Sequence, residues 1–162
     1  MSHEHHKDIT VRAAVITVST SRTEKTDLSG KFLREAFEAA GMPVVYQTLV
    51  ADVEEDIRAA ANAAAEEADC IVLTGGTGLT RDDCTIEAVT PLFRKTIDGF
   101  GELFRQMSMT QVGTAVLLSR ATAGLIGDAA VFCIPGSPKA ASLAAGDIII
   151  PEIKHIITHC RQ

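Results

Sequence analysis

The sequence contains no tryptophan and one tyrosine, and aromatic residues make up 4% of its 162 residues. Proteins that bind single-stranded nucleic acid stack bases on clustered aromatic side chains, so this composition argues against that class. The net charge of −6 and the pI near 5.3 also argue against non-specific nucleic-acid binding, which depends on a basic face. A small anionic ligand remains compatible, because backbone amides and one basic side chain are enough to bind a phosphate.

The sequence also lacks the patterns of disulfide-rich, zinc-binding and membrane proteins. Its four cysteines form no C-x-x-C pair, and Cys70 and Cys133 lie in apolar runs, where cysteine behaves as a small hydrophobe. This pattern predicts a reducing compartment with no disulfide framework and no zinc site. Because there is no hydrophobic leader and no apolar run of about 18 residues, we expect a cytoplasmic protein with no membrane partner.

The N-terminus, MSHEHHKD, is polar and contains three of the five histidines, His3, His5 and His6. Three histidines could chelate a metal, but a polar terminus is more simply a mobile tail. We therefore expect residues 1–10 to form a mobile tail and residues 11–162 to form a single domain.

Apolar runs with the spacing of strands alternate with segments that have the spacing of helices. The pattern predicts strands at 13–19, 44–50, 70–75, 115–119 and 130–135. It predicts helices at 28–40, 52–68, 85–93, 99–109, 137–149 and 151–160. Repeated β-α-β units of this kind predict an α/β fold, a three-layer αβα sandwich around a mostly parallel sheet.

The segments that follow the predicted strands are polar or rich in glycine. In an open α/β sheet, ligands bind beyond the carboxyl ends of the strands, so these segments should contain the binding residues. The candidates there are Ser19, Ser21, Arg22, Asp52, Gly75, Gly76, Thr77, Gly78, Ser119, Arg120, Gly136, Ser137 and Lys139.

The most distinctive of these segments is TGGTG at 74–78. Glycines allow positive φ and close approach of backbone N–H groups to a ligand, so the run is either a phosphate-binding loop or simply a tight turn. It is not a P-loop, because G-x-x-x-x-G-K-[ST] is absent. It is not the dinucleotide fingerprint either, because Arg81 stands where the third glycine belongs.

Carboxylates follow two of the predicted strands, and each has two interpretations. Asp82 and Asp83 come just after the glycine-rich run, where Mg²⁺ could link a carboxylate to phosphate oxygens. Either aspartate could instead cap the next helix. Asp52 precedes the helix predicted at 52–68 with Glu55 three residues later, a spacing that favours a capping box.

Two further segments combine charge with a predicted helix. In PGSPK at 135–139, Ser137 suits the N-cap, and Lys139 in the first turn favours a nearby anion, since it opposes the helix dipole. In the helix predicted at 99–109, the spacing of Glu102 and Arg105 favours a surface ion pair. The histidines all lie near the two ends of the chain, so the sequence does not indicate a Ser-His-Asp or Cys-His site.

Five motifs, in this order and over residues 12–158, resemble the MogA/MoaB family of molybdenum cofactor biosynthesis proteins, with the loop closer to the MoaB branch. They are VSTSR (18–22), TGGTGLTRDDCTIEA (74–88), GFGELFRQMS (99–108), SRATAG (119–124) and PGSPKA (135–140). The resemblance implies an adenylyltransferase that converts molybdopterin and Mg²⁺-ATP to adenylylated molybdopterin and pyrophosphate. It also implies a homotrimer or homohexamer.

By the same resemblance, Asp83 and Asp52 are the catalytic carboxylates, and Asp83 holds Mg²⁺ through ATP. The loop at 74–78 would then bind phosphates, with Lys139 and Arg22 as phosphate contacts and Ser137 and Ser19 as hydrogen-bonding groups. Further candidate site residues are Asp27, Arg81, Asp82, Thr85 and Glu102. The alternative is a non-catalytic oligomer of the MoaB branch that binds molybdopterin without adenylylating it.

Overall fold

The computed structural model describes residues 9–162, so the histidines at 3, 5 and 6, considered above as metal ligands, lie outside the described residues. Ile9, placed in the tail by the sequence, packs against the core. The elements in chain order are β1 (Ala13–Val18), α1 (Leu28–Ala39), β2 (Val44–Val50), α2 (Glu54–Glu67), β3 (Cys70–Thr74), α3 (Thr85–Val89), η2 (Thr90–Leu92), β4 (Lys95–Thr96), α4 (Asp98–Val112), η3 (Gly113–Leu118), β5 (Thr122–Ile126), β6 (Ala129–Ile134), α5 (Pro138–Ser142), η4 (Leu143–Ile149) and α6 (Ile150–Cys160).

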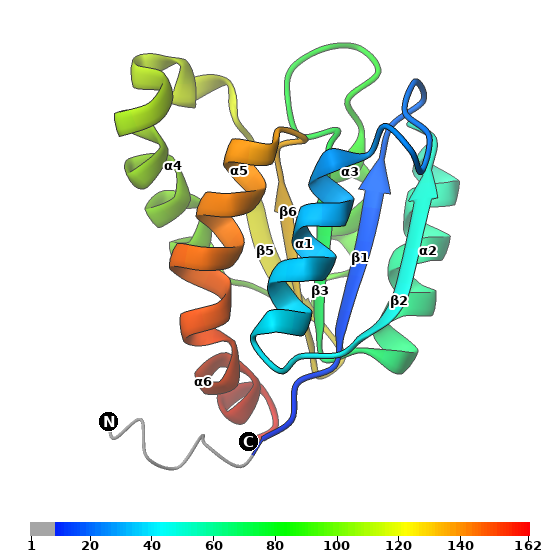
Figure 1. Cartoon of the computed structure of the whole chain (residues 1–162), viewed down its shortest axis with the longest axis vertical. Helices are drawn as coiled ribbons and strands as arrows, with labels where there is room; N and C mark the ends of the chain where they lie inside the picture. The colour runs from blue at the N-terminus through cyan, green and yellow to red at the C-terminus, as the bar shows by residue number, and fades with distance from the viewer. Residues whose placement is uncertain (1–8) are drawn as a thin grey trace.

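The six strands form one sheet in the order β2-β1-β3-β6-β5-β4. The first four strands in this order are parallel, while β5 and β4 run antiparallel to their neighbours. The carboxyl ends of β1, β2, β3 and β6 therefore meet at one edge, which is uppermost in Figure 1. The prediction of a mostly parallel sheet is confirmed.

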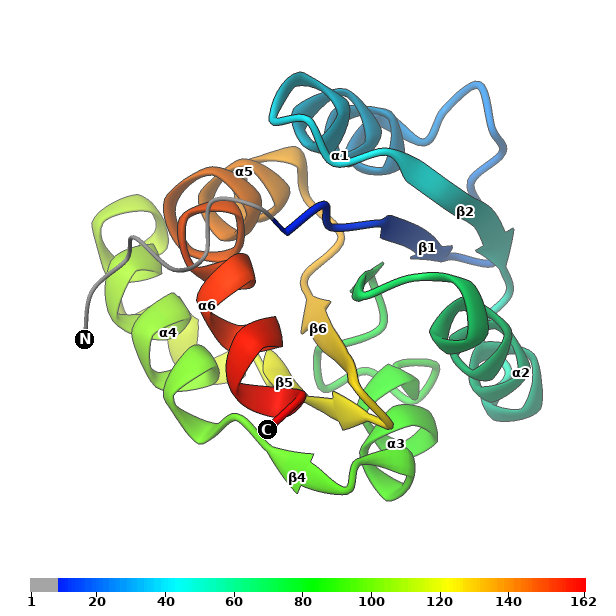
Figure 2. The same cartoon turned by 90° about the horizontal axis from the view of Figure 1, so that it is seen from below.

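Helices cover both faces of the sheet, which confirms the three-layer prediction. Figure 2 shows α1, α4, α5 and α6 on one face and α2 and α3 on the other. Side chains from alternate strand positions fill the two cores: Val15, Val72 and Phe132 belong to one, and Ile16 and Ile71 to the other. Strands buried on both faces explain the almost continuous apolar runs in the sequence. Within residues 9–162, no helix combines the length and the apolarity needed to cross a membrane.

The antiparallel edge differs from the prediction. The strand predicted at 115–119 is wrong, because this segment belongs to the 3₁₀ helix η3, which has no buried residue. The sheet strand is β5 instead, and it continues through Gly127, whose φ of 58° suits a two-residue hairpin turn into β6. Gly124 lies inside β5 because a Cβ there would come within 2.3 Å of the Phe93 ring.

The helices predicted at 137–149 and 151–160 are parts of one continuous helical segment. A π-helical stretch, η4, joins α5 to α6, and Pro151 lies in the first turn of α6.

At the edge of the sheet opposite the carboxyl ends of the parallel strands, the buried carboxylate of Asp69 accepts hydrogen bonds from the Arg12 backbone at 2.9 Å and the Arg161 guanidinium at 3.0 Å. Asp69 therefore links the chain just before β1 to the chain just after α6.

Asp27 caps α1. One of its carboxylate oxygens accepts from the Gly30 amide at 2.9 Å, and the other accepts from the buried hydroxyl of Thr17. Asp27 is itself buried, and it lines neither of the two cavities at the carboxyl edge of the sheet. Its contacts join the start of α1 to the carboxyl-terminal part of β1 and leave it outside the candidate site.

We predict that Asp27→Ala lowers the free energy of unfolding by about 2 kcal/mol, because it removes the cap and leaves the Thr17 hydroxyl buried without an acceptor. Urea unfolding followed by circular dichroism would measure this loss. Glu35→Gln, an exposed position on the same helix, is the control and should change stability by less than about 0.5 kcal/mol. Equal unfolding midpoints for the two variants would contradict the prediction.

Candidate functional site

Two cavities lie side by side at the carboxyl edge of the sheet, with volumes of about 530 and 510 Å³. They share three lining residues, Gly76, Asp83 and Gly136. These residues come from the loop after β3 and the turn after β6, whose strands are neighbours in the sheet. The segments that the sequence predicts to meet at this edge therefore do meet, and Asp83 stands at their junction.

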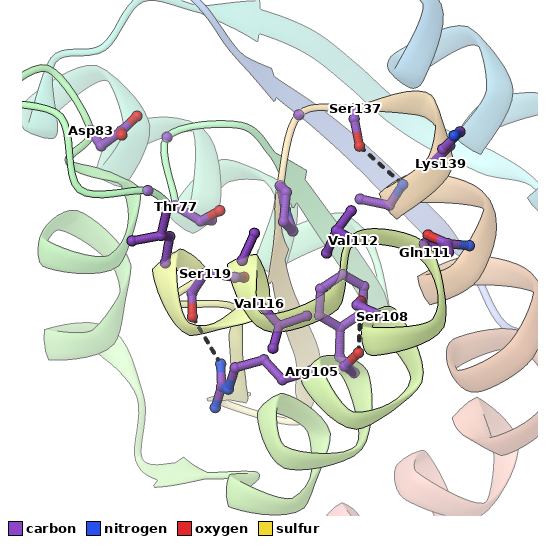
Figure 3. Close-up of a pocket in the computed structure, with 18 residues that line it drawn as sticks. Thr77, Asp83, Arg105, Ser108, Gln111, Val112, Val116, Ser119, Ser137 and Lys139 are labelled. Atoms are coloured by element: carbon purple, nitrogen blue, oxygen red, sulfur yellow. Dashed lines mark hydrogen bonds between the residues drawn. The ribbon is translucent and has the colours of Figure 1, made fainter.

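The first cavity has one mostly apolar wall and one polar wall. Phe104 and Val112 of α4 and Val116 of η3 form the apolar side, and Arg105, Ser108 and Gln111 add polar groups. Figure 3 draws Lys139 and Gln111 at one end of the cavity and Asp83 at the other. Of the sequence-predicted residues, this cavity gathers Gly76, Thr77, Gly78, Asp83, Ser119, Gly136, Ser137 and Lys139.

The second cavity is polar. It is lined by the loop after β1, by the glycine-rich loop and by three carboxylates, and among residues 9–162 Arg22 is its one basic side chain. Of the sequence-predicted residues, this cavity gathers Ser19, Ser21, Arg22, Asp52, Gly75, Gly76, Asp82, Asp83 and Gly136. A cavity with more carboxylates than cations is suited to a ligand that arrives with a metal ion.

The glycine-rich loop presents a row of amides to the cavities. The carbonyls of Gly75 and Gly76 accept from the hydroxyl (2.8 Å) and amide (3.1 Å) of Thr85, and the Thr77 carbonyl accepts from the Arg120 amide at 3.0 Å. In a trans peptide, the N–H of the next residue points opposite to the carbonyl. The N–H groups of residues 76–78 are therefore directed away from these partners, and within residues 9–162 they donate to no acceptor. Such a row of free amides binds anions.

Glycine is required at this loop for two reasons. Gly75 and Gly76 have φ values of 106° and 71°, a conformation that other residues rarely adopt. A Cβ at Gly76 would lie 2.2 Å from the Thr85 hydroxyl, and one at Gly78 would lie 2.7 Å from the Asp83 carboxylate. The backbone of the loop therefore packs directly against Thr85 and Asp83.

Each of the two predicted catalytic carboxylates has one oxygen held by a threonine, Asp83 by one of its own loop and Asp52 by one of the loop after β1. Oδ2 of Asp83 accepts from the amide (3.0 Å) and hydroxyl (2.9 Å) of Thr80, and Oδ2 of Asp52 accepts from the amide (3.1 Å) and hydroxyl (2.8 Å) of Thr20. Within residues 9–162, the Oδ1 atom of each accepts no hydrogen bond. Both carboxylates are thereby oriented and keep an oxygen for a ligand.

The helix-capping interpretation of these aspartates is wrong. The N-cap of α2 is Val53, and the N-cap of α3 is Cys84; neither makes a side-chain capping bond. Each helix begins two residues after Asp52 or Asp83, so these carboxylates remain in the loops that precede the helices. The capping prediction for Ser137 is confirmed, since its hydroxyl accepts from the Ala140 amide at 3.1 Å.

The basic residues of the site have different environments. Arg22 donates to the Gly136 carbonyl at 2.8 Å and lines the second cavity, whereas Lys139 is exposed at the first. The predicted ion pair between Glu102 and Arg105 is wrong, because Arg105 instead donates to the carbonyls of Ala121 (2.8 Å) and Ser119 (3.4 Å). Arg105 thereby fixes the chain between η3 and β5.

Several predicted residues do not line either cavity. Arg81 and Glu102 are exposed outside both, and Thr85 and Arg120 lie behind the glycine-rich loop and donate to its carbonyls. Ser119 and Arg120 reach this edge for a reason the sequence did not reveal. They precede the antiparallel strand β5, and the start of an antiparallel strand lies where its parallel neighbours end.

Sequence reasoning missed Ser108, Gln111 and Thr20. Ser108 and Gln111 line the first cavity from the last turns of α4, and Thr20 orients Asp52. The helix predicted at 99–109 includes Ser108 but ends before Gln111, whereas α4 continues to Val112. Ser108 and Gln111 are three residues apart, a spacing that places them on one face of a helix, and this is the signal that could have identified them.

The pKa of the Cys84 thiol reflects its burial and the carboxylates near it. Burial raises the pKa of the Cys84 thiol, and the carboxylates of Asp52, Glu54, Glu87 and Asp83 raise it further. Burial also raises the pKa of Cys133 to about 12. A raised pKa disfavours the thiolate, so Cys84 is unsuited to act as a nucleophile at neutral pH. The local potential at the junction is negative and favours a cation.

Comparison with known proteins places the chain in a family. Residues 14–155 match the model of the MoCF_biosynth family, described as a probable molybdopterin binding domain. Molybdenum cofactor biosynthesis protein B of Bacillus subtilis (strain 168) is 44% identical, covering 100% of this chain and 99% of that protein. The protein of the same name from Escherichia coli (strain K12) is 41% identical, covering 94% and 91%.

Solved structures agree with the sequence matches. A crystal structure of molybdenum cofactor biosynthesis protein B aligns with a TM-score of 0.91 at 44% identity, over 95% of this chain and 98% of that one. The tungsten cofactor synthesizing protein MoaB from Pyrococcus furiosus aligns with a TM-score of 0.86 at 40% identity, over 94% and 98%. The chain therefore belongs to the MoCF_biosynth family of probable molybdopterin binding domains, among the relatives named molybdenum cofactor biosynthesis protein B.

Proposed function

We propose that the chain acts in molybdenum cofactor biosynthesis by adenylylating molybdopterin with Mg²⁺-ATP, forming adenylylated molybdopterin and pyrophosphate. The observation that carries this proposal is the junction at Asp83, where two cavities of about 500 Å³ each meet beside a row of free amides. Two substrates that react with each other need two adjoining cavities and a shared point of contact. Asp83 is that point.

The lining of each cavity matches one part of this chemistry. The apolar wall formed by Phe104 and Val112, with the Gln111 amide and Ser108 hydroxyl beside it, suits a flat heteroaromatic ring that needs both stacking area and hydrogen bonds. The free amides of residues 76–78 suit phosphates at the junction. Lys139 lines the first cavity and Arg22 lines the second, and each would supply positive charge to phosphate oxygens.

The residues present fit Mg²⁺ carried in with ATP. Oδ1 of Asp83 accepts no hydrogen bond within residues 9–162, while its Oδ2 is held by Thr80, so one oriented oxygen remains. The described residues contain no cluster of three or more side chains that would hold a metal by themselves. The one oriented oxygen of Asp83 matches the preference of Mg²⁺ for one or two carboxylates plus phosphate oxygens. Asp83 would hold the ion, which would neutralise phosphate charge and polarise the α-phosphate.

The transfer needs no general base from the chain. The terminal phosphate of molybdopterin is already anionic near pH 7, and one of its oxygens bonds to the α-phosphorus of ATP. The bond from that phosphorus to the bridging oxygen breaks, and pyrophosphate leaves with its electron pair. The chain contributes alignment, through Asp83, Asp52 and the amide row, and charge neutralisation, through Lys139 and Arg22. Histidine and thiolate groups have no task in such a reaction.

We further propose that the chain assembles as a homotrimer or homohexamer. Exposed apolar side chains gather on α4 and η3, beside the first cavity. Leu117 is 74% exposed, and Val112, Leu118 and Met109 are each at least 50% exposed. A contiguous apolar patch on a protein surface marks an interface. Sedimentation equilibrium would give the mass of the assembly, and a monomer would contradict this part of the proposal.

We expect Asp83→Asn to lower the rate of adenylyl transfer by about 100-fold or more, since it removes a charge that acts on the transferring phosphate, and to leave molybdopterin affinity within about twofold. Adenylylated pterin and pyrophosphate would be assayed together. Asp147→Asn, an exposed carboxylate outside both cavities, is the control and should keep the wild-type rate. Retained activity in Asp83→Asn would remove this residue from the mechanism.

The same assay separates the enzyme from a non-catalytic binding protein. Both would bind molybdopterin, but only the enzyme would release pyrophosphate in the presence of Mg²⁺-ATP. Tight pterin binding by the wild type with no product would show that the chain is a binding oligomer. Product that forms without added Mg²⁺ would contradict the assigned role of the metal.

We expect Gly76→Ala to cost roughly 1–3 kcal/mol of folding stability, because φ is 71° and the new Cβ would meet the Thr85 hydroxyl. The displaced peptide should also weaken ATP binding by about tenfold, the scale of one lost charge-assisted hydrogen bond. Gly146→Ala is the matched control, since a Cβ there meets nothing within 4 Å. Thermal unfolding and calorimetry would measure both effects, and equal behaviour of the two variants would argue against the amide row.

A further inference from the structure

Arg120 contacts the glycine-rich loop and the start of α3 through both its backbone and its side chain. Its Nε donates to the Gly78 carbonyl at 2.9 Å, and its own amide donates to the Thr77 carbonyl at 3.0 Å. One terminal nitrogen makes a longer contact of 3.5 Å with the Asp83 carbonyl, and the other pairs with the Glu87 carboxylate. One residue thus contacts the loop at three carbonyls and the first full turn of α3 at a carboxylate.

These contacts orient peptide groups of the loop and do not involve a ligand. A carbonyl that is held on one side turns the next N–H to the other side. The Arg120 backbone amide therefore orients the N–H of Gly78, and its guanidinium orients the N–H of Leu79, just as Thr85 orients those of Gly76 and Thr77. Its contact with the Asp83 carbonyl ties the backbone that carries the candidate metal-binding carboxylate to the same guanidinium.

The guanidinium is already committed to the protein. Arg120 lines neither cavity, and Glu87 balances its charge. Its planar fork serves the Gly78 carbonyl, the Asp83 carbonyl and the Glu87 carboxylate at the same time. A lysine ammonium carries the same charge but cannot reproduce this geometry. Substitution by lysine therefore keeps the positive charge of Arg120 and removes the planar hydrogen-bonding geometry of its guanidinium.

We propose that Arg120 is a positioning residue that holds the amide row and Asp83 in register for the transferring phosphate, rather than a phosphate ligand. This inference rests on the proposed adenylyl transfer and deepens it. It also predicts which kinetic quantity changes. The Arg120 side chain makes no hydrogen bond with α4, which forms the apolar wall of the first cavity, so pterin affinity should be spared.

The test compares Arg120→Lys with Arg94→Lys. Arg94 is a matched control, because its guanidinium also holds two backbone carbonyls, those of Gly127 (2.6 Å) and Cys160 (3.0 Å), and pairs with a carboxylate, that of Asp128. It lines neither of the two cavities at the site. Measurements would be made well below the Tm of every variant.

We expect Arg120→Lys to lower kcat by about 10- to 100-fold and to raise the Mg²⁺ concentration for half-maximal rate, with the KM for molybdopterin within about twofold. Affinity for Mg²⁺-pyrophosphate, measured by calorimetry, should fall about tenfold. Arg94→Lys should change none of these quantities, even where its Tm falls. A loss of turnover in Arg120→Lys that Arg94→Lys reproduces would overturn the assignment.

The pyrophosphate measurement keeps this inference separate from the proposed reaction. Wild-type protein that makes no adenylylated pterin would overturn adenylyl transfer, and Mg²⁺-pyrophosphate affinity would still decide the role of Arg120. Wild-type affinity in Arg120→Lys, or no pyrophosphate binding by the wild type, would overturn the positioning role. A rise in KM for molybdopterin with kcat unchanged would overturn it as well, since it would place Arg120 in substrate binding.

Discussion

The candidate site depends on the hydrogen bonds that Thr85 donates to the loop after β3. Its hydroxyl and amide donate hydrogen bonds to two consecutive carbonyls, those of Gly75 and Gly76. Because Thr85 begins α3, which packs against α2 and the sheet, the loop takes its shape from the core. A loop built from glycine has large conformational freedom, and these bonds remove it at the positions where the backbone lies along the cavities.

The two cavities differ in chemistry because they are built from different kinds of element. The first is closed by the side chains of α4 and η3, which supply apolar surface, and the second is closed by loops that follow β1 and β2, which supply hydroxyls and carboxylates. Burial raises the pKa of Cys84, and the carboxylates of Asp52 and Asp83 add to that rise. A cation would offset these negative charges, and the oriented oxygens of Asp83 and Asp52 are placed to receive one.

Much of this arrangement could be predicted from the sequence, because buried parallel strands have strong apolar runs and ligands bind beyond their carboxyl ends. The positions of Asp83, Asp52 and the glycine-rich loop followed from that rule. The antiparallel edge could not be predicted, because the apolar run at 115–119 lies against a cavity and solvent, while β5 contains a glycine that makes room for Phe93. Periodicity does not encode such long-range contacts. For the same reason, the contacts of Arg105 and Arg120 with backbone carbonyls were not foreseen from local spacing.

The carboxylate of Asp69 joins the chain before β1 to the chain after α6, at the edge of the sheet opposite the cavities. In Figure 1 the C-terminus lies at this lower end, far from the loops that surround the site. The described chain thus begins and ends on the same side. A fluorescent label or a surface linker attached after Gln162 would leave both cavity mouths facing solution, whereas removal of Arg161 would release the contact that holds the end of the chain against the body of the protein.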